Sequence, residues 1–327
     1  MSQLYPIKFN PILKERIWGG TRLSELYSRE LPPGVPIGES WEICDRKEGV
    51  SIIANGKYEG QSLRWLMENF EGSLLGESRS QNGSFPLLIK ILDAREKLSL
   101  QVHPPAHRAA ELQGEPKTEM WFITHAEPAA DLYVGLKSGV TPEEFAARID
   151  DGSVAGCFHH IPVSKGDCMF LPSGRVHAIG AGNVIFEIQQ NSDTTYRVFD
   201  WNRVGLDGKP RELHVDASLK SIDFNDFEPS LAQPMDRHPE LPGSGCLVED
   251  ALFTVWKCEW LDVTSSEFST GNYCHIIGVY DGSLEIDTAA TDNPVSLEAG
   301  QFCLIPASLE KVRLRSKSSA FLIAKAG

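Results

Sequence analysis

The sequence lacks long apolar runs and an excess of basic charge. No run approaches the ~18 apolar residues of a membrane span, and the start MSQLYPIKFNPILKERIWGG has neither the basic beginning nor the apolar stretch of a signal peptide. The 31 basic residues are outnumbered by 45 acidic ones, and the net charge is -14. This argues against non-specific nucleic-acid binding, which needs a basic face, although a few local Lys and Arg residues can hold one phosphate. We therefore expect no nucleic-acid partner and no membrane partner.

Paired-cysteine motifs are also missing. The chain has seven cysteines, an odd number, and none forms a CxxC pair. This argues against a disulfide framework. It is typical of reduced cysteines that pack as small apolar side chains in a cytoplasmic protein.

Helical periodicity is scarce. QSLRWLMENFEGSLL (61–75) places apolar residues on one helical face, TPEEFAARID (141–150) begins with Thr141 as an N-cap, and residues 104–116 predict one short helix. Most other ordered segments are short, strand-like and bounded by Gly, Pro, Asn or Asp. No regular strand–helix alternation is present. We therefore predict a mainly β protein of antiparallel barrels or jelly rolls with a few short helices.

Two unequal domains are predicted. The segment PSLAQPMDRHPELPGSG (229–245) has four prolines and two glycines, which is typical of a linker between a domain at 1–228 and a smaller one at 246–327. A weak internal repeat supports this division, because GDCMFLPSGRVH and GQFCLIPASLEK share Gly and Pro at the same offsets. The first copy ends in His177 and the second in Lys311, so metal chemistry is expected in the larger domain only.

Four side chains form a candidate metal site. Gln101 and His103 lie two residues apart in SLQVHPP, so on a strand they point to the same face just before a turn. Glu119 follows in an apolar segment, and His177 comes after the turn LPSGRVH. Two imidazoles, a carboxylate and an amide oxygen suit a divalent ion such as zinc. The residues alone leave an ordinary strand end equally open.

The same segments carry a family resemblance. GDCMFLPSGRVHAIGAGN resembles the second motif of the cupins, while the first motif is altered: Gln101 replaces a His, and fifteen residues separate His103 from Glu119. QVHP, KTEMW, GRVHAIG and GNVIFEIQQNSDTTYRV resemble, in this order, the type I phosphomannose isomerases. ERIWGG and IGESWEI resemble the shorter bacterial members of that family.

The resemblance implies a fold and an activity. The fold would be two cupin-like jelly-roll barrels, and one Zn²⁺ per chain would be held by Gln101, His103, Glu119 and His177. The activity would be the interconversion of mannose 6-phosphate and fructose 6-phosphate through an enediol, a step in carbohydrate metabolism. A divalent cation stabilises the charge that develops on the adjacent oxygen. The expected partner is the phosphosugar, and the expected assembly is a monomer or weak homodimer.

The general base has three candidates. Lys117 lies two residues before Glu119, so both would point into one cavity, and a nearby cation helps a lysine to lose its proton. Many members of the family carry a His before this Lys, but here the position is Pro116, which cannot transfer a proton. The base is therefore Lys117, Glu187 in the apolar run NVIFEIQQ, or a zinc-bound water. Arg197 matches the family's active-site arginine, whose fork of donors would hold substrate oxygens.

The resemblance also implies phosphate contacts. Arg211 falls where longer members hold the phosphate with a Lys, and Lys209 or Arg203 are alternatives. Ser99 and Lys90 match positions associated with phosphate contact. The residues alone favour a Lys90 whose head reaches solvent from the apolar run PLLIKIL.

Trp18 is a further candidate for substrate contact. It precedes Gly19 and Gly20, and a role in the core is favoured over stacking on a ligand. The glycine pair alone is no dinucleotide-binding fingerprint.

Two other functions remain open. Two His and one Glu also form the metal-binding triad of non-haem iron oxygenases, which occur on cupin barrels. A catalytically silent cupin that senses a sugar phosphate is the second alternative, for which the replacement at Pro116 is the one supporting feature.

Overall fold

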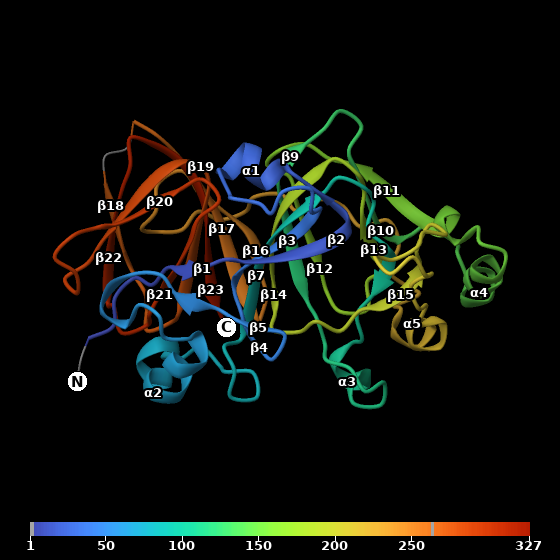
Figure 1. The fold of residues 1–327 in the computed structure, drawn as a ribbon, viewed down its shortest axis with the longest axis horizontal. Helices are drawn as coiled ribbons and strands as arrows, with labels where there is room; N and C mark the ends of the chain where they lie inside the picture. Colours follow the sequence, from blue (N-terminus) through green and yellow to red (C-terminus); the bar gives the residue numbers. More distant parts are fainter. Residues whose placement is uncertain (1–2, 263–264) are drawn as a thin grey trace.

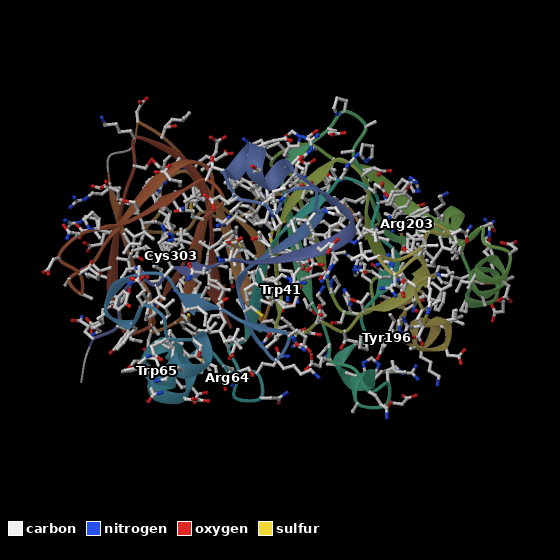
Figure 2. The ribbon with its side chains drawn as sticks, viewed as in Figure 1. Trp41, Arg64, Trp65, Tyr196, Arg203 and Cys303 are labelled. Carbon is white, nitrogen blue, oxygen red and sulfur yellow. The ribbon has the colours of Figure 1, made fainter. Side chains whose placement is uncertain are left out.

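A computed structural model describes residues 3–262 and 265–327 (Figure 1). Strands predominate and the helices are few and short, which confirms the predicted fold class. Two curled β structures lie side by side, one coloured blue to yellow and the other orange to red (Figure 1). Cys303 is inside the second, whereas Tyr196 and Arg203 lie at the far end of the first (Figure 2).

A six-stranded antiparallel sheet forms the centre of the molecule. Its strands, in spatial order, are β12 (Cys168–Leu171), β9 (Glu119–Ala126), β14 (Asn183–Gln190), β7 (Leu87–Ala94), β3 (Ile37–Ile43) and β2 (Ile12–Gly20). Ile89, Ile91 and Phe186 point to one face and share a core with Leu304 and Phe302 of the C-terminal strands. Because side chains alternate along a strand, the intervening residues point to the opposite face, which looks into the first barrel.

A five-stranded antiparallel sheet closes that barrel. Its order is β11 (Phe158–Pro162), β10 (Asp131–Leu136), β13 (His177–Ile179), β8 (Leu100–Val102) and β15 (Tyr196–Phe199). Leu132 and Ile179 pack inward against Trp121 of the six-stranded sheet. Leu100 and Ala178 belong to a separate core that helices α4 (Pro142–Asp150) and α5 (Val215–Ser221) help to form. The interior between the two sheets is therefore where a site can form.

The C-terminal strands form an eight-stranded sheet. They are β16 (Ser244–Glu249), β17 (Phe253–Leu261), β18 (Ser266–Ser269), β19 (His275–Asp287), β20 (Val295–Glu298), β21 (Phe302–Ile305), β22 (Lys311–Arg315) and β23 (Ser318–Ala326). The two repeat copies have the same local structure. Gly166 and Gly300 have positive φ angles of 97° and 82°. Each lies two residues before a four-residue strand, β12 or β21. The strand after that begins at His177 in the first copy and at Lys311 in the second.

The helices match two of the three predictions closely. They are α1 (Arg22–Tyr27), α2 (Leu63–Leu75), α3 (Ala106–Ala109), α4 (Pro142–Asp150) and α5 (Val215–Ser221), with 3-10 turns η1 (Gly56–Tyr58) and η2 (Val154–Cys157). The hydroxyl of Thr141 accepts the backbone N–H of Glu144 at 3.2 Å, which confirms the predicted cap of α4. The helix within 104–116 is only four residues long, and α1 and α5 have no periodic signal long enough to predict them.

The N-terminal residues pack on the C-terminal sheet. Ile7 pairs with Leu304, and Ile7 and Leu4 lie in the core that both barrels share. Two small sheets accompany this segment: β1 (Phe9–Asn10) with β6 (Ile52–Ile53), and β4 (Asp45–Arg46) with β5 (Gly49–Val50). The predicted linker carries no helix or strand until β16 begins. The domain boundaries at 228 and 246 stay a prediction.

All seven cysteines are buried and unpaired, as the sequence indicates. None of the helices in residues 3–262 and 265–327 is both long and apolar enough to cross a membrane.

Gly19, the first glycine after Trp18, allows β2 and β3 to approach closely. A Cβ on Gly19 would lie 2.8 Å from the Cα of Gly38 and closer still to its backbone nitrogen. We therefore expect Gly19→Ala to destabilise the fold by about 1–3 kcal/mol, the usual effect of overpacking. Gly72→Ala in α2 is the matched control, because its Cβ meets no atom within 4 Å and alanine favours a helix by about 0.5–1 kcal/mol. Urea unfolding of both variants measures the difference, and equal stabilities would contradict this view of the strand contact.

Candidate metal centre

Strand pairing brings the four predicted ligands together. Gln101 on β8 lies directly opposite His177 at the start of β13. His103 follows β8 by one residue, and Glu119 begins β9 on the facing sheet. One ligand atom each from His103, Glu119 and His177 lie within 4.8 Å of one another, and all three residues are buried. Among the residues that the structure describes, no other group of this kind occurs.

The ligand atoms converge on the carboxylate of Glu119. Its Oε2 is 3.7 Å from Nε2 of His103, and its Oε1 is 3.4 Å from Nε2 of His177. The side-chain amide nitrogen of Gln101 is 3.2 Å from the same Nε2 of His177. Turning this amide by half a turn would present its oxygen instead, since the two ends of an amide have the same shape.

Both imidazoles are fixed in the tautomer that a metal needs. The Nδ1–H of His103 donates to the backbone oxygen of Thr194 at 2.7 Å, and the Nδ1–H of His177 donates to that of Arg175 at 2.9 Å. A carbonyl oxygen only accepts, so Nε2 of each ring carries the lone pair. Such a bond on the second nitrogen is the usual support of a metal-ligating histidine.

The protonation states also fit a cation. Burial, and then the charge of Lys117, lower the pKa of His103 to about 4, and burial lowers the pKa of His177. Burial alone would raise the pKa of Glu119, but Lys117 and His103 outweigh it and hold that pKa well below its usual range. Neutral imidazole and ionised carboxylate are the ligand forms. Nε2 of His103 and Oε1 of Glu119 are buried without a hydrogen-bond partner, and Oε2 of Glu119 is paired with the ammonium of Lys117, so this group could hold a metal ion.

The candidate base residues lie beside this group. Lys117 is 4% exposed, and its Nζ is 2.7 Å from Oε2 of Glu119 and 3.9 Å from Oε1 of Glu187. The other oxygen of Glu187 accepts the indole N–H of Trp121 at 3.0 Å. Nζ of Lys90 is 3.3 Å from Oε1 of Glu187, so this lysine is buried against carboxylates and does not reach solvent.

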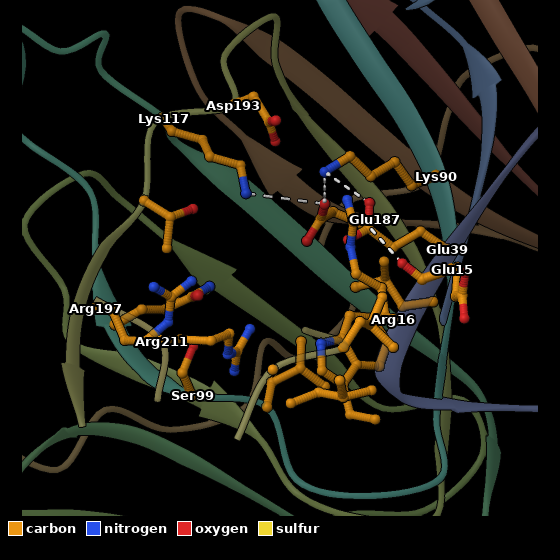
Figure 3. A pocket seen from close by; sticks show the side chains of 18 of the residues that line it. Glu15, Arg16, Glu39, Lys90, Ser99, Lys117, Glu187, Asp193, Arg197 and Arg211 are labelled. Carbon is orange, nitrogen blue, oxygen red and sulfur yellow. Dashed lines mark hydrogen bonds and ion pairs between the residues drawn. The ribbon is translucent and has the colours of Figure 1, made fainter. Parts of the chain in front are cut away.

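A cavity of about 600 Å³ opens beside the metal group. Lys90, Lys117 and Glu187 lie on one side of it, and Arg197, Arg211 and Ser99 lie together on the other (Figure 3). The Nε of Arg211 donates to Asp200 at 2.7 Å, and a second contact between its Nη2 and the same carboxylate fixes the guanidinium as a fork. Lys209 and Arg203, the alternatives to Arg211, do not line this cavity.

Trp18 packs in the core, as the sequence favours, and its contact with substrate stays a prediction. It is 4% exposed, packs in the core with Leu92, and also lines the cavity.

Sequence reasoning missed several cavity residues, of which three charged ones matter most here. They are Arg16, Glu39 and Asp193. Glu39 carried a usable signal, because it is a carboxylate in the otherwise apolar strand IGESWEI, as Glu187 is in NVIFEIQQ. Arg16 and Asp193 lie among other polar residues, where a charged side chain is ordinary.

Comparison with known proteins identifies the family. Residues 7–115 match the model of the phosphomannose isomerase type I catalytic domain. The chain is 35% identical to mannose-6-phosphate isomerase ManA of Bacillus subtilis over 317 residues, which cover 94% of this chain and 95% of the relative. The chain belongs to the type I phosphomannose isomerases.

Two further comparisons agree with this membership. A mannose-6-phosphate isomerase of Streptococcus mutans is 38% identical over 253 residues, 77% of this chain and 78% of the relative. The crystal structure of the mannose 6-phosphate isomerase from Bacillus subtilis superposes with a TM-score of 0.87 at 30% identity, covering 99% of this chain and all of the other. Within the type I phosphomannose isomerases, this chain is therefore matched over nearly its whole length.

Proposed function

We propose that this chain interconverts mannose 6-phosphate and fructose 6-phosphate. One observation carries the proposal: cationic side chains line a cavity that also reaches Gln101 and Lys117, which adjoin the buried group of His103, Glu119 and His177. The first suits charge development at a sugar oxygen, and the second suits a phosphate. The names of the relatives support the same substrate pair.

Arg197, Arg211 and Ser99 are proposed to receive the phosphosugar's oxygens. Arg197 keeps its Nε buried without a partner while its Nη1 donates to the backbone of Glu212 at 2.8 Å. A rigid, partly unsatisfied guanidinium is well suited to bind an oxyanion. Arg211 is held in place by Asp200, so it reaches the cavity in one orientation. Phosphate contact by Lys90 and substrate contact by Trp18 stay predictions.

Lys117 and Glu187 are proposed to move the proton between C2 and C1. In the aldose the carbonyl is at C1, and in the ketose it is at C2, so a proton must leave C2 and arrive at C1. Nζ of Lys117 and Oε1 of Glu187 are 3.9 Å apart, both residues line the cavity, and Oε1 lies between the ammonium groups of Lys117 and Lys90. A base must be within hydrogen-bond reach of its proton, and these two atoms are the protein groups placed to satisfy that requirement.

Gln101, His103, Glu119 and His177 are proposed to hold one zinc ion. Two imidazoles, a carboxylate and an amide oxygen would supply four ligands, and catalytic zinc can expand to a fifth position that substrate would take. The bound ion would supply Lewis-acid stabilisation of the enediolate oxygen. The four side chains contribute a fixed set of lone pairs, buried between the two sheets.

The two alternatives are not favoured. An iron oxygenase would not need the cationic set across the cavity, and a silent sensor would not need a buried carboxylate of Glu187 beside Lys117. The relatives named above are isomerases and match most of the chain.

We also propose a cytoplasmic protein that is a monomer or weak homodimer. Seven buried free cysteines support a reducing compartment. Light scattering over a range of protein concentrations tests the assembly.

Removal of the metal tests the proposed function. Dialysis against a chelator is expected to abolish conversion of mannose 6-phosphate, and one equivalent of Zn²⁺ should restore it. The measurement is fructose 6-phosphate formation in a coupled assay, together with metal content. Full activity in the metal-free protein would contradict the proposal, and turnover that needs oxygen would support an oxygenase.

A further inference from the structure

Six side chains of alternating charge cross the cavity side of the six-stranded sheet. They are Arg16, Glu39, Lys90, Glu187, Lys117 and Glu119. Lys90 and Glu187 lie directly opposite each other on neighbouring strands, and Trp41 and Trp121 flank them in the same row. Figure 3 shows the ion pairs that join Lys90 to both Glu39 and Glu187.

Glu39 is the most tightly held carboxylate of this row. Its Oε1 accepts the Nε–H of Arg16 at 2.7 Å, and its Oε2 accepts the indole N–H of Trp41 at 2.6 Å. It is 8% exposed. Burial alone would raise its pKa, but Lys90 and Arg16 outweigh burial and lower the pKa to about 2. Glu39 is therefore a fixed anion whose oxygens are already occupied, so it has little capacity left to bind substrate.

Lys90 links this anion to the proposed proton-transfer pair. Its Nζ lies 3.8 Å from Oε2 of Glu39 and 3.3 Å from Oε1 of Glu187, and it is 5.4 Å from the centre of the Trp41 ring. Burial alone would lower the pKa of Lys90, but Glu187 and Glu39 outweigh it and raise the pKa above its ordinary value. The ammonium is thus shared by two carboxylates, and its position decides how Oε1 of Glu187 faces the cavity.

We propose that Glu39 is a positioning residue for the isomerisation, and that it acts through Lys90. It holds the ammonium between two carboxylates, which keeps Oε1 of Glu187 beside Lys117 and the bound sugar. Lys90 then acts on the side of the cavity where the proton is transferred, and its charge does not bind the phosphate. The inference rests on the proposed function, because it concerns the proton transfer of that reaction.

Glu39→Gln tests the inference in the full-length, zinc-loaded enzyme. The amide cannot hold the Lys90 ammonium, so Glu187 loses its fixed position. We expect kcat for mannose 6-phosphate to fall at least about 10-fold, since a displacement of about 1 Å can cost up to about 100-fold. KM should change less than about 2-fold, because phosphate binding is not touched. A rise in KM with unchanged kcat would overturn the inference and would indicate that Lys90 binds the phosphate.

Glu42→Gln is the matched control. Glu42 lies on the same strand, is also buried at 4% exposure, and pairs with Arg29 at 2.7 Å, but it does not line the cavity. The Glu42→Gln variant measures the general effect on kcat of removing a buried carboxylate from β3. We expect its kcat to stay within about 2-fold of the unaltered enzyme. An equal fall of kcat in both variants would overturn the inference.

A double-mutant cycle separates positioning from a general structural role. If Glu39 acts through Lys90, then Glu39→Gln should have no further effect on kcat in a Lys90→Gln background, whereas independent effects would multiply.

Trp41→Phe provides a second route if Glu39→Gln does not fold, because it removes the indole donor to the same carboxylate and keeps a ring in the core. Its fall in kcat should also vanish in the Lys90→Gln background. Multiplying effects in the cycle overturn the inference, whereas absence of turnover in the unaltered enzyme would instead refute the proposed function.

Discussion

Replacing His177 with alanine is expected to remove the bound metal and to lower turnover of mannose 6-phosphate by more than about 100-fold. Loss of a residue that only supports a metal ligand lowers metal affinity or activity by up to about 100-fold, and loss of the ligand itself should cost more. The ring supplies a lone pair 3.4 Å from Oε1 of Glu119 and is locked in that tautomer by Arg175. No other side chain among those described stands ready to replace it in the buried group. Elemental analysis and the coupled assay measure the two effects.

The control for this variant is His160→Ala. His160 lies on β11 of the same five-stranded sheet, but its side chain is 46% exposed and faces Asp131 at 3.5 Å, outside the metal group. It should keep both metal and activity. The C-terminal sheet should stay folded in both variants, because it has an apolar cluster of its own around Phe321 and Trp260 in addition to the core that it shares with the central sheet. Stoichiometric metal in the purified His177→Ala protein would show that the ligand assignment is wrong.

The metal group was predictable because its residues occur in short local patterns. A two-residue spacing puts Gln101 and His103 on one side of a strand whatever the rest of the fold does. The turn before His177 contains Pro172 and Gly174, and a turn that begins with Pro306 precedes Lys311. Such signals need only local geometry, and the strand pairing then brings Gln101 opposite His177.

Other features depend on contacts that no local pattern records. The pairing of Ile7 with Leu304 joins the two ends of the chain, and nothing in the sequence around either residue indicates the partner. Asp200 is an ordinary loop aspartate in the sequence, yet it fixes the orientation of Arg211. The shift of Lys90 from an expected solvent contact to a buried ammonium has the same origin, because Glu39 and Glu187 come from different strands.

Lys117→Ala is the second substitution with a large expected effect. Removing the amine takes away one of the two protein groups proposed to move the proton, so kcat should fall by about 100-fold or more, the usual size of general acid–base catalysis. Lys97→Ala is a suitable control, because Lys97 is an exposed lysine that packs over Trp201 and does not line the cavity. The measurements are kcat in the coupled assay and zinc content.

The zinc content of the Lys117→Ala variant decides how its kcat is interpreted. The lysine lies 2.7 Å from Glu119, so its ammonium competes with a bound divalent cation for the same carboxylate. Like charges repel more strongly in a buried site than in water, and removal of the lysine should therefore leave zinc binding as tight or tighter. A large fall in kcat with full zinc then assigns Lys117 to the proton transfer. If kcat stays unchanged at full zinc, Glu187 carries the transfer without it, and loss of zinc would mean that Lys117 only orients the ligand Glu119.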